Sequence, residues 1–129
     1  MPSPHPTDGE LAILRVLWNR NAPTTVREVH EVLQRTKSTA YTTVLKILTI
    51  MYEKGLVERD ESERSHRFVA SHPEPVVQAS LLKDFVQRTF GGSAVKLVQR
   101  ALDDHASSDE LDAMARLIED ARARKARRR

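Results

Sequence analysis

The sequence predicts a mainly α fold with a small β-hairpin. Three observations support this prediction. Apolar residues recur at helical spacing in three successive segments before Gly55, the pattern then alternates between residues 56 and 70, and helical spacing returns after Pro75. The chain has 129 residues, which is about one domain's worth or a small domain with an appendage.

The first two helices each begin with a capping box. Thr7 and Glu10 form the capping box of a first helix expected over about Thr7 to Asn21, whose apolar residues are Leu11, Ile13, Leu14, Leu17 and Trp18. After a break at Pro23, Thr25 and Glu28 open a second helix expected to reach about Arg35, with the buried stripe Val26, Val29 and Leu33.

The third predicted helix has two chemically different faces. It begins with Ser38 or Thr39 as N-cap and ends at Gly55, a position suited to a left-handed C-terminal cap. The packing face is expected to hold Ala40, Tyr41, Val44, Leu45, Ile47, Leu48, Met51 and Tyr52. The outward face is expected to hold Thr39, Thr42, Thr43, Lys46, Thr49 and Ile50.

The threonines of the outward face favour DNA recognition. Threonine is a mediocre helix former, so helix propensity does not explain it here. Its short hydroxyl side chain lets a helix approach base edges, and its methyl group suits the thymine methyl. The alternative is that Thr42 and Thr43 only bond back to carbonyls of their own helix.

The alternating segment predicts a wing. Residues 56–59 and 66–70 form a hairpin around a polar turn, and three helices followed by a hairpin make a winged helix-turn-helix. Arg64 and Arg67 are expected to contact phosphate, although the neighbouring acids would also fit a solvated turn. The predicted DNA-binding residues are Ser38, Thr39, Tyr41, Thr42, Thr43, Lys46, Arg64, His66 and Arg67.

These residues resemble the penicillinase and methicillin-resistance repressors and their copper-responsive relatives, the BlaI/MecI/CopY-type family. The matching blocks are Glu10–Leu14 with Leu17-Trp18, Ala40–Val44 with Leu48 and Glu53–Val57, and Phe90–Ser93 with Leu97-Val98. The resemblance covers nearly the whole chain. It implies a dimeric winged-helix repressor that binds an inverted repeat with TACA and TGTA half-sites.

The second half is predicted to hold a dimer together. Helices are expected over about Pro75–Phe90, from Ser93, and from the capping box of Ser107 and Glu110. These helices contain too few residues for an independent core, and a second copy of the chain is therefore the expected partner. The alternative is that the helices fold back onto the winged helix and give a monomer. The predicted dimerisation residues are Val77, Leu81, Leu82, Phe85, Phe90, Val95, Leu97, Val98, Leu102, Leu111, Met114, Leu117 and Ile118.

Pro73 and Pro75 mark a boundary in the chain, and the charge distribution sets a basic C-terminal part apart from the rest. Residues 1–72 are expected to form the DNA-binding domain, 73–121 the helical dimerisation region and 122–129 a disordered basic tail. The tail carries the basic excess through Arg122, Arg124, Lys125, Arg127, Arg128 and Arg129. It is expected to fray into solvent, the alternative being an auxiliary phosphate contact.

Composition excludes several classes of site. The chain has no cysteine, which fits the cytoplasm and rules out disulfides, thiolate metal sites and the cysteine cluster of copper-responsive relatives. We find no catalytic pairing, metal-ligand spacing, phosphate loop or membrane span, so no enzyme activity or cofactor is predicted. His30 is interpreted as a surface residue rather than a catalytic base.

The resemblance also implies a protease partner, but the residues at the matching cleavage site differ in this chain. In the antibiotic-responsive members a sensor protease cuts an Asn-Phe bond, and the matching pair here is Arg100-Ala101. The prediction is therefore a repressor of double-stranded operator DNA, with a sensor protease as a further partner. A winged helix can also bind protein, and the outward Ile50 favours that alternative of an interaction module.

Overall fold

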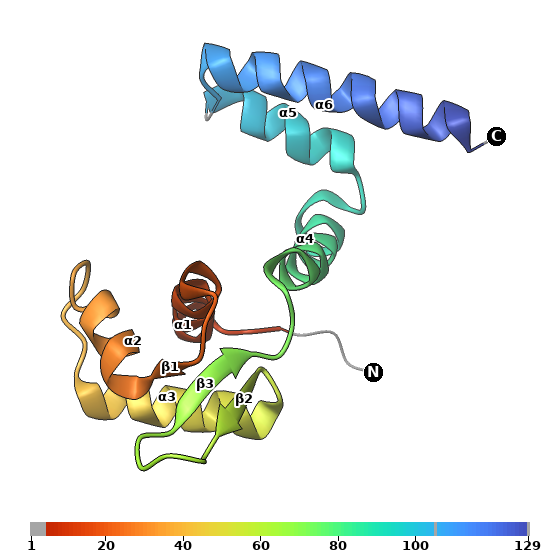
Figure 1. Ribbon diagram of the computed structural model, residues 1–129. Helices are drawn as coiled ribbons and strands as arrows, with labels where there is room; N and C mark the ends of the chain where they lie inside the picture. Colours follow the sequence, from red (N-terminus) through yellow and green to blue (C-terminus); the bar gives the residue numbers. More distant parts are fainter. Residues whose placement is uncertain (1–4, 105, 129) are drawn as a thin grey trace. The chain divides into compact units, whose positions relative to one another are not determined.

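The computed structural model describes residues 5–104 and 106–128 and contains two compact units, residues 1–82 and 83–129 (Figure 1). The division falls inside helix α4 (Glu74–Phe90), whereas the sequence placed a boundary between residues 72 and 73. Pro73 directly precedes α4 and Pro75 lies in its first turn, where proline is tolerated because those N–H groups have no helical partner.

The first unit opens with two capped helices. Helix α1 (Asp8–Arg20) begins at the Thr7–Glu10 capping box and ends at Asn21, which adopts a left-handed conformation with φ of 50°. Strand β1 (Thr24–Thr25) leads into α2 (Val26–Leu33), capped by Thr25 and Glu28 as predicted. Both boxes satisfy N–H groups that a helix start otherwise leaves unpaired.

Helix α3 (Tyr41–Lys54) begins later than the sequence predicted. Its N-cap is Ala40, which makes no side-chain cap hydrogen bond, and not Ser38 or Thr39. Thr39 is unsuited because its hydroxyl donates to the Lys37 carbonyl at 3.1 Å. The C-terminal prediction is confirmed, since Gly55 adopts φ of 81° and its N–H bonds to the last turn.

The wing is a three-stranded antiparallel sheet with the order β1-β3-β2. Strands β2 (Val57–Asp60) and β3 (Arg67–Ala70) form the predicted hairpin, and β1 pairs Thr24 with Phe68 and Thr25 with Arg67. The sequence did not predict β1, because two residues are too few to show an alternating pattern. This pairing fixes the hairpin beside the start of α2.

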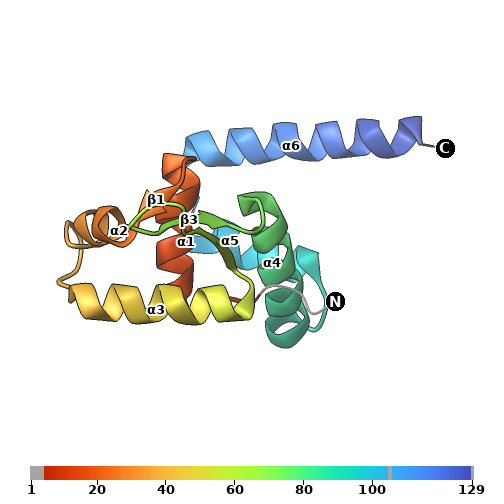
Figure 2. The same ribbon diagram turned by 60° about the horizontal axis from the view of Figure 1, so that its bottom comes forward.

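The core of the first unit joins all three helices to the sheet. It comprises Ile13, Leu14, Val16, Leu17, Val26, Val29, Val44, Leu48, Met51, Leu56, Val57 and Phe68. Figure 2 shows α3 extended along one edge of this unit. One face of α3 fills the core with Val44, Leu48 and Met51, so the opposite face is free.

A buried acid ties the start of α1 to the end of α3. The Glu10 side chain is 4% exposed, and its two carboxylate oxygens each lie 3.0 Å from Lys54 Nζ. The Thr7 backbone N–H donates to the same carboxylate at 2.9 Å. Burial raises the pKa of Glu10, but the Thr7 and Lys54 contacts outweigh burial and leave that pKa below its usual value.

The second unit contains the end of α4, α5 (Ala94–Asp104) and α6 (Ser108–Arg127). The predicted Ser107–Glu110 capping box is present at the start of α6. Among the described residues of this unit no side chain is fully buried. Within the described part of the chain, no helix is long and apolar enough to cross a membrane.

The basic segment differs from the expected frayed tail. Helix α6 continues through Ala121, Ala123 and Ala126 to Arg127, while Arg129 lies outside the described residues. Alanine and arginine are among the best helix formers, and cations near a helix C-terminus interact favourably with its dipole. These local preferences extend the helix beyond residue 121.

Candidate nucleic-acid interface

The outward face of α3 presents exposed hydrogen-bonding side chains at helical spacing. Thr42, Thr43 and Lys46 are all exposed, as predicted from the helical period. The predicted packing face was too wide, because Tyr41, Leu45 and Tyr52 are 45%, 43% and 40% exposed. The core therefore occupies a narrower arc of α3 than hydrophobicity alone indicated.

The threonines of α3 differ in their hydrogen bonds. The Thr49 hydroxyl donates to the Leu45 carbonyl at 2.8 Å, which is the local bonding expected of a threonine within a helix. In the described ranges 5–104 and 106–128, the hydroxyls of Thr42 and Thr43 make no such bond. Those two hydroxyl groups are therefore available to a ligand.

The residues before α3 have structural roles that the sequence did not show. His30 Nε2 lies 2.7 Å from the Thr39 carbonyl oxygen, and the His30 ring meets Tyr41 edge-on at 5.7 Å between centroids. Gln34 accepts from the Thr39 N–H at 2.7 Å. His30 is thus half-buried and holds the start of α3, whereas the sequence placed it on the surface. Ser38 is exposed.

A groove of about 770 Å³ lies between α3 and the wing. It is lined by Thr25, Val26, Arg27, Glu28, Tyr41, Leu45, Thr49, Arg59, Glu63, Arg64, Ser65, His66, Arg67 and Phe68. Four arginines against two glutamates make its lining cationic. Such a surface suits a phosphate backbone.

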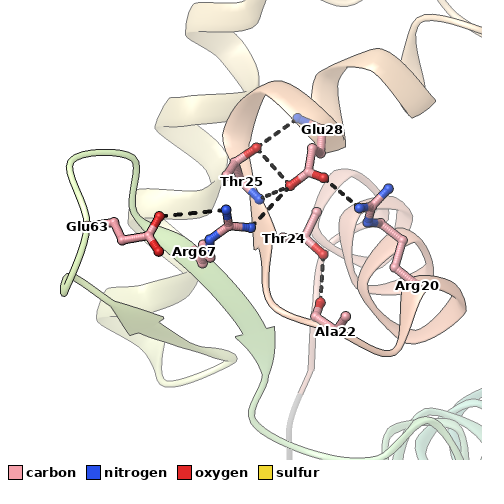
Figure 3. A network of polar contacts seen from close by, with 7 residues as sticks. All are labelled: Arg20, Ala22, Thr24, Thr25, Glu28, Glu63 and Arg67. Carbon is pink, nitrogen blue, oxygen red and sulfur yellow. Dashed lines mark hydrogen bonds and ion pairs between the residues drawn. The ribbon is translucent and has the colours of Figure 1, made fainter.

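Glu28 connects the wing to α1 and α2 through a polar network (Figure 3). Its carboxylate caps α2, pairs with Arg20 at 2.6 Å and lies 3.8 Å from Arg67. Hydrogen bonds from the Thr25 backbone N–H and hydroxyl, with smaller contributions from Arg20 and Arg67, lower the pKa of Glu28. The acid thus stays ionised and restrains the base of the wing.

The predicted wing residues do not share one environment. Arg67 lies between Glu28 and Glu63, the latter at 3.7 Å, so it is half-buried and paired (Figure 3). Arg64 and His66 are exposed at the tip, and neither takes part in an ion pair within residues 5–104 and 106–128. Arg64 is therefore the most available predicted phosphate contact of the wing.

Several groove residues escaped the sequence argument. Arg27 is exposed on α2, and Arg59 stacks its guanidinium 4.1 Å above the Tyr52 ring and pairs with Glu61. Leu45 was placed in the core. Only the pairing of β1 with β3 brings α2 next to the wing, so no sequence pattern would have grouped Arg27 with Arg64.

The predicted dimerisation residues are mostly uncovered within a single chain. Leu82, Phe85, Val95, Val98, Leu102, Leu111, Leu117 and Ile118 are between 39% and 77% exposed. Leu81, Phe90, Leu97 and Met114 are half-buried, and Phe85 meets Phe90 edge-on at 5.7 Å. Val77 differs, since it is 1% exposed and so unavailable to a second subunit.

The pair Arg100-Ala101 lies inside helix α5, where Arg100 is exposed and Ala101 half-buried. Arg100 lies 3.5 Å from Asp103 of the same helix. The peptide bond between Arg100 and Ala101 therefore has a helical and not an extended conformation. Within the described ranges, no cluster of three potential metal ligands occurs.

Comparison with known proteins identifies the family. A model of the penicillinase repressor family matches residues 6–120. The chain belongs to the penicillinase repressor family. This family consists of transcriptional repressors and not enzymes, in agreement with the sequence prediction.

Relatives of the penicillinase repressor family match over most of their length. The chain is 32% identical over 111 residues to the transcriptional regulator BlaI of Mycobacterium tuberculosis, covering 86% of this chain and 80% of that protein. It is 20% identical over 112 residues to the penicillinase repressor of Staphylococcus aureus, covering 86% of this chain and 88% of that repressor.

A solved structure supports the winged-helix fold. The monomeric form of Bacillus licheniformis BlaI, in complex with the blaP half-operator, superposes with a TM-score of 0.50 at 21% identity. The match covers 58% of this chain and 90% of that one. The predicted fold class, a winged helix with further C-terminal helices, is confirmed.

Proposed function

We propose that this penicillinase repressor family member is a homodimeric repressor that binds an inverted-repeat operator. Helix α3 enters the major groove, and its N-terminal residues contact base edges. Arg64 and other cations of the groove beside α3 contact the phosphate backbone. The complex of monomeric Bacillus licheniformis BlaI with a half-operator supports the DNA-binding part of this proposal.

The observation that carries the proposal is the pair of unbonded hydroxyls on α3. Thr42 and Thr43 are exposed within the first turn, and their hydroxyls do not bond to the helix in the described part of the chain. Lys46 is exposed one turn later. Short hydroxyls followed by a long cation suit bases near the helix start and a guanine or phosphate further along.

The exposed apolar side chains of the second unit support the homodimer. Val95, Leu117 and Ile118 are 77%, 65% and 51% exposed, and the cost of leaving such surface in water favours a partner. A second copy is the partner that a palindromic operator requires, since a two-fold protein reads two half-sites. Residues 83–121 are thus proposed as the dimerisation region.

Selection from a random duplex pool tests the proposal at near-physiological salt. Purified protein is mixed with the pool, and the retained duplexes are sequenced. We expect an inverted repeat with TACA and TGTA half-sites. Retention without a motif would contradict sequence-specific binding, and the interaction-module alternative suggested by the exposed Ile50 would then lead.

Matched threonine variants assign the contact to α3. Thr42→Ala or Thr43→Ala is expected to weaken binding to the selected duplex by about 1–3 kcal/mol and to relax preference at one base pair. Thr49→Ala is the control, because its hydroxyl is already bonded to Leu45. Equal losses from all three variants would contradict the assignment.

The wing is tested by the salt dependence of binding. Each phosphate contact contributes about 0.9 to the slope of log affinity against log salt. Arg64→Ala is expected to make that slope less steep, and Arg67→Ala is expected to have a smaller effect, because Arg67 is paired with Glu28 and Glu63. An unchanged slope for both variants would remove the wing from the interface.

If a sensor protease relieves repression, the bond matched by the family resemblance is Arg100-Ala101. A protease binds an extended substrate, so α5 would have to unwind locally before cleavage. Mass spectrometry of the repressor from induced cells tests this route. Fragments that begin at Ala101 are expected, and an intact chain during induction would exclude cleavage.

A further inference from the structure

The last two turns of α6 form a helical segment with an unbalanced positive charge. Residues 121–128 contain five cations, three alanines and no acid. The cations are Arg122, Arg124, Lys125, Arg127 and Arg128. The family match ends at residue 120, so this segment is a feature of this chain beyond the region shared with the family.

Like charges crowd this segment. Arg124 and Arg128 are spaced i,i+4, and Lys125 and Arg128 are spaced i,i+3, which places cations next to each other on the helix surface. Within the described ranges, one ion pair reaches the segment, between Arg122 and Glu119 at 3.9 Å. Binding of a polyanion would reduce the repulsion between these neighbouring cations.

Acids of the same unit do not balance this charge. Asp84 pairs with Arg88, Asp103 with Arg100 and Glu119 with Arg122. Glu110 is used in the capping box of α6. These four acids already have partners, and within the described residues no ion pair joins an acid to Arg124, Lys125, Arg127 or Arg128, which are exposed and available to an external polyanion.

We propose that residues 122–128, which are the end of α6 and its C-cap Arg128, are a second, sequence-independent contact to the phosphate backbone of duplex DNA. The uncharged residues of the segment are only alanines, and its cations occupy most of the helix circumference, apart from an arc that carries Ala123 and Ala126. A membrane-surface helix instead needs a continuous face of large apolar residues. A phosphate backbone requires only charge. This inference extends the proposed operator binding, yet its test needs no operator.

The test uses the full chain and a random-sequence duplex. In the variant, Arg124, Lys125, Arg127 and Arg128 are all changed to Gln, and affinity is measured between about 50 and 200 mM salt. At about 0.9 for each lost phosphate contact, the slope of log affinity against log salt should fall by about 0.9 to 3.6 for each chain. The charge-preserving control R124K/R127K/R128K should keep the wild-type slope.

Lysine footprinting provides a measurement that does not depend on a variant. Duplex DNA should slow acetylation of Lys125 and leave the exposed Lys96 unaffected. A slope change below about 0.9 for the Gln variant would overturn the proposal. Protection of Lys125 that depends on dimer concentration and not on DNA would also overturn the proposal. The same holds if the segment binds only vesicles of equal parts phosphatidylglycerol and phosphatidylcholine and not duplex DNA. Selection from the random duplex pool with the Thr42→Ala variant tests the proposed operator binding separately, since that variant keeps all the cations of residues 122–128.

Discussion

The buried Glu10–Lys54 pair offers a sharp test of what joins α1 to α3. Glu10→Gln keeps an oxygen that can accept the Thr7 N–H but removes the charge that faces Lys54. Lys54→Met removes the other partner and keeps much of its apolar length. Comparing both single variants with the double variant isolates the interaction between the two side chains.

The structure sets the size of the effect. Both Glu10 oxygens lie 3.0 Å from Lys54 Nζ, but the Lys54 side chain is 45% exposed and the Glu10 side chain only 4%. A fully buried pair loses about 3–5 kcal/mol when one partner is removed, and an exposed pair about 0–1 kcal/mol. We therefore expect about 2 kcal/mol for Lys54→Met, which leaves a buried carboxylate, and a coupling energy of about 1–2 kcal/mol.

Urea unfolding followed by the fluorescence of Trp18, the single tryptophan, measures these energies at a fixed protein concentration. Because the folded pKa of Glu10 is lowered, the pair stabilises the protein above the usual glutamate pKa. That stabilisation is lost as pH falls through the folded pKa. A coupling energy below about 0.3 kcal/mol, or an equal pH dependence in wild type and Glu10→Gln, would refute this reasoning.

Three further predictions concern other parts of the chain. Gly55→Ala should destabilise the first unit by about 1 kcal/mol in urea unfolding, because Gly55 has φ of 81°, a backbone conformation that alanine rarely adopts. No atom lies within 4 Å of an added Cβ, so a steric clash would not contribute, and an unchanged urea midpoint would exclude backbone strain. Glu28→Gln should make stability less dependent on pH in acid, because the ionised Glu28 stabilises the folded state and this contribution is lost as pH falls through its lowered pKa. Identical acid-unfolding profiles of wild type and variant would contradict this. Leu117→Asp should turn dimers into monomers in sedimentation equilibrium, whereas Gln99→Asp should not; a dimeric Leu117→Asp variant would place the interface elsewhere.

Local sequence signals predicted most elements of the fold. The three capping boxes at Thr7, Thr25 and Ser107 and the left-handed Gly55 are satisfied by neighbours only a few residues away, so their patterns are visible in the chain. Errors arose where the deciding contact was distant. Tyr41 and Leu45 were assigned to the core because they are apolar, but the arc of α3 that packs is set by α1, α2 and the sheet.

The candidate interface shows the same division. The helical period of α3 was enough to place Thr42, Thr43 and Lys46 outward, because side-chain direction follows from the backbone repeat. The pairing of Arg67 with Glu28, and the grouping of Arg27 with Arg64 in one groove, could not be predicted. These residues are far apart in the chain, and the strand pairing of β1 with β3 brings them together.

The sequence by itself thus determined the helices, the hairpin and the repressor family, since these follow from residue spacing and from blocks that the family shares. Only the tertiary structure decided which α3 hydroxyls lack a local partner, which wing arginine is paired and which apolar residues stay uncovered. The uncovered apolar residues and the Arg67–Glu28 pair depend on which side chains meet across long sequence separations, whereas the bond of each hydroxyl depends on the conformation of its own threonine in the folded helix. Packing and side-chain conformation in the folded chain determine these properties, and residue spacing alone does not.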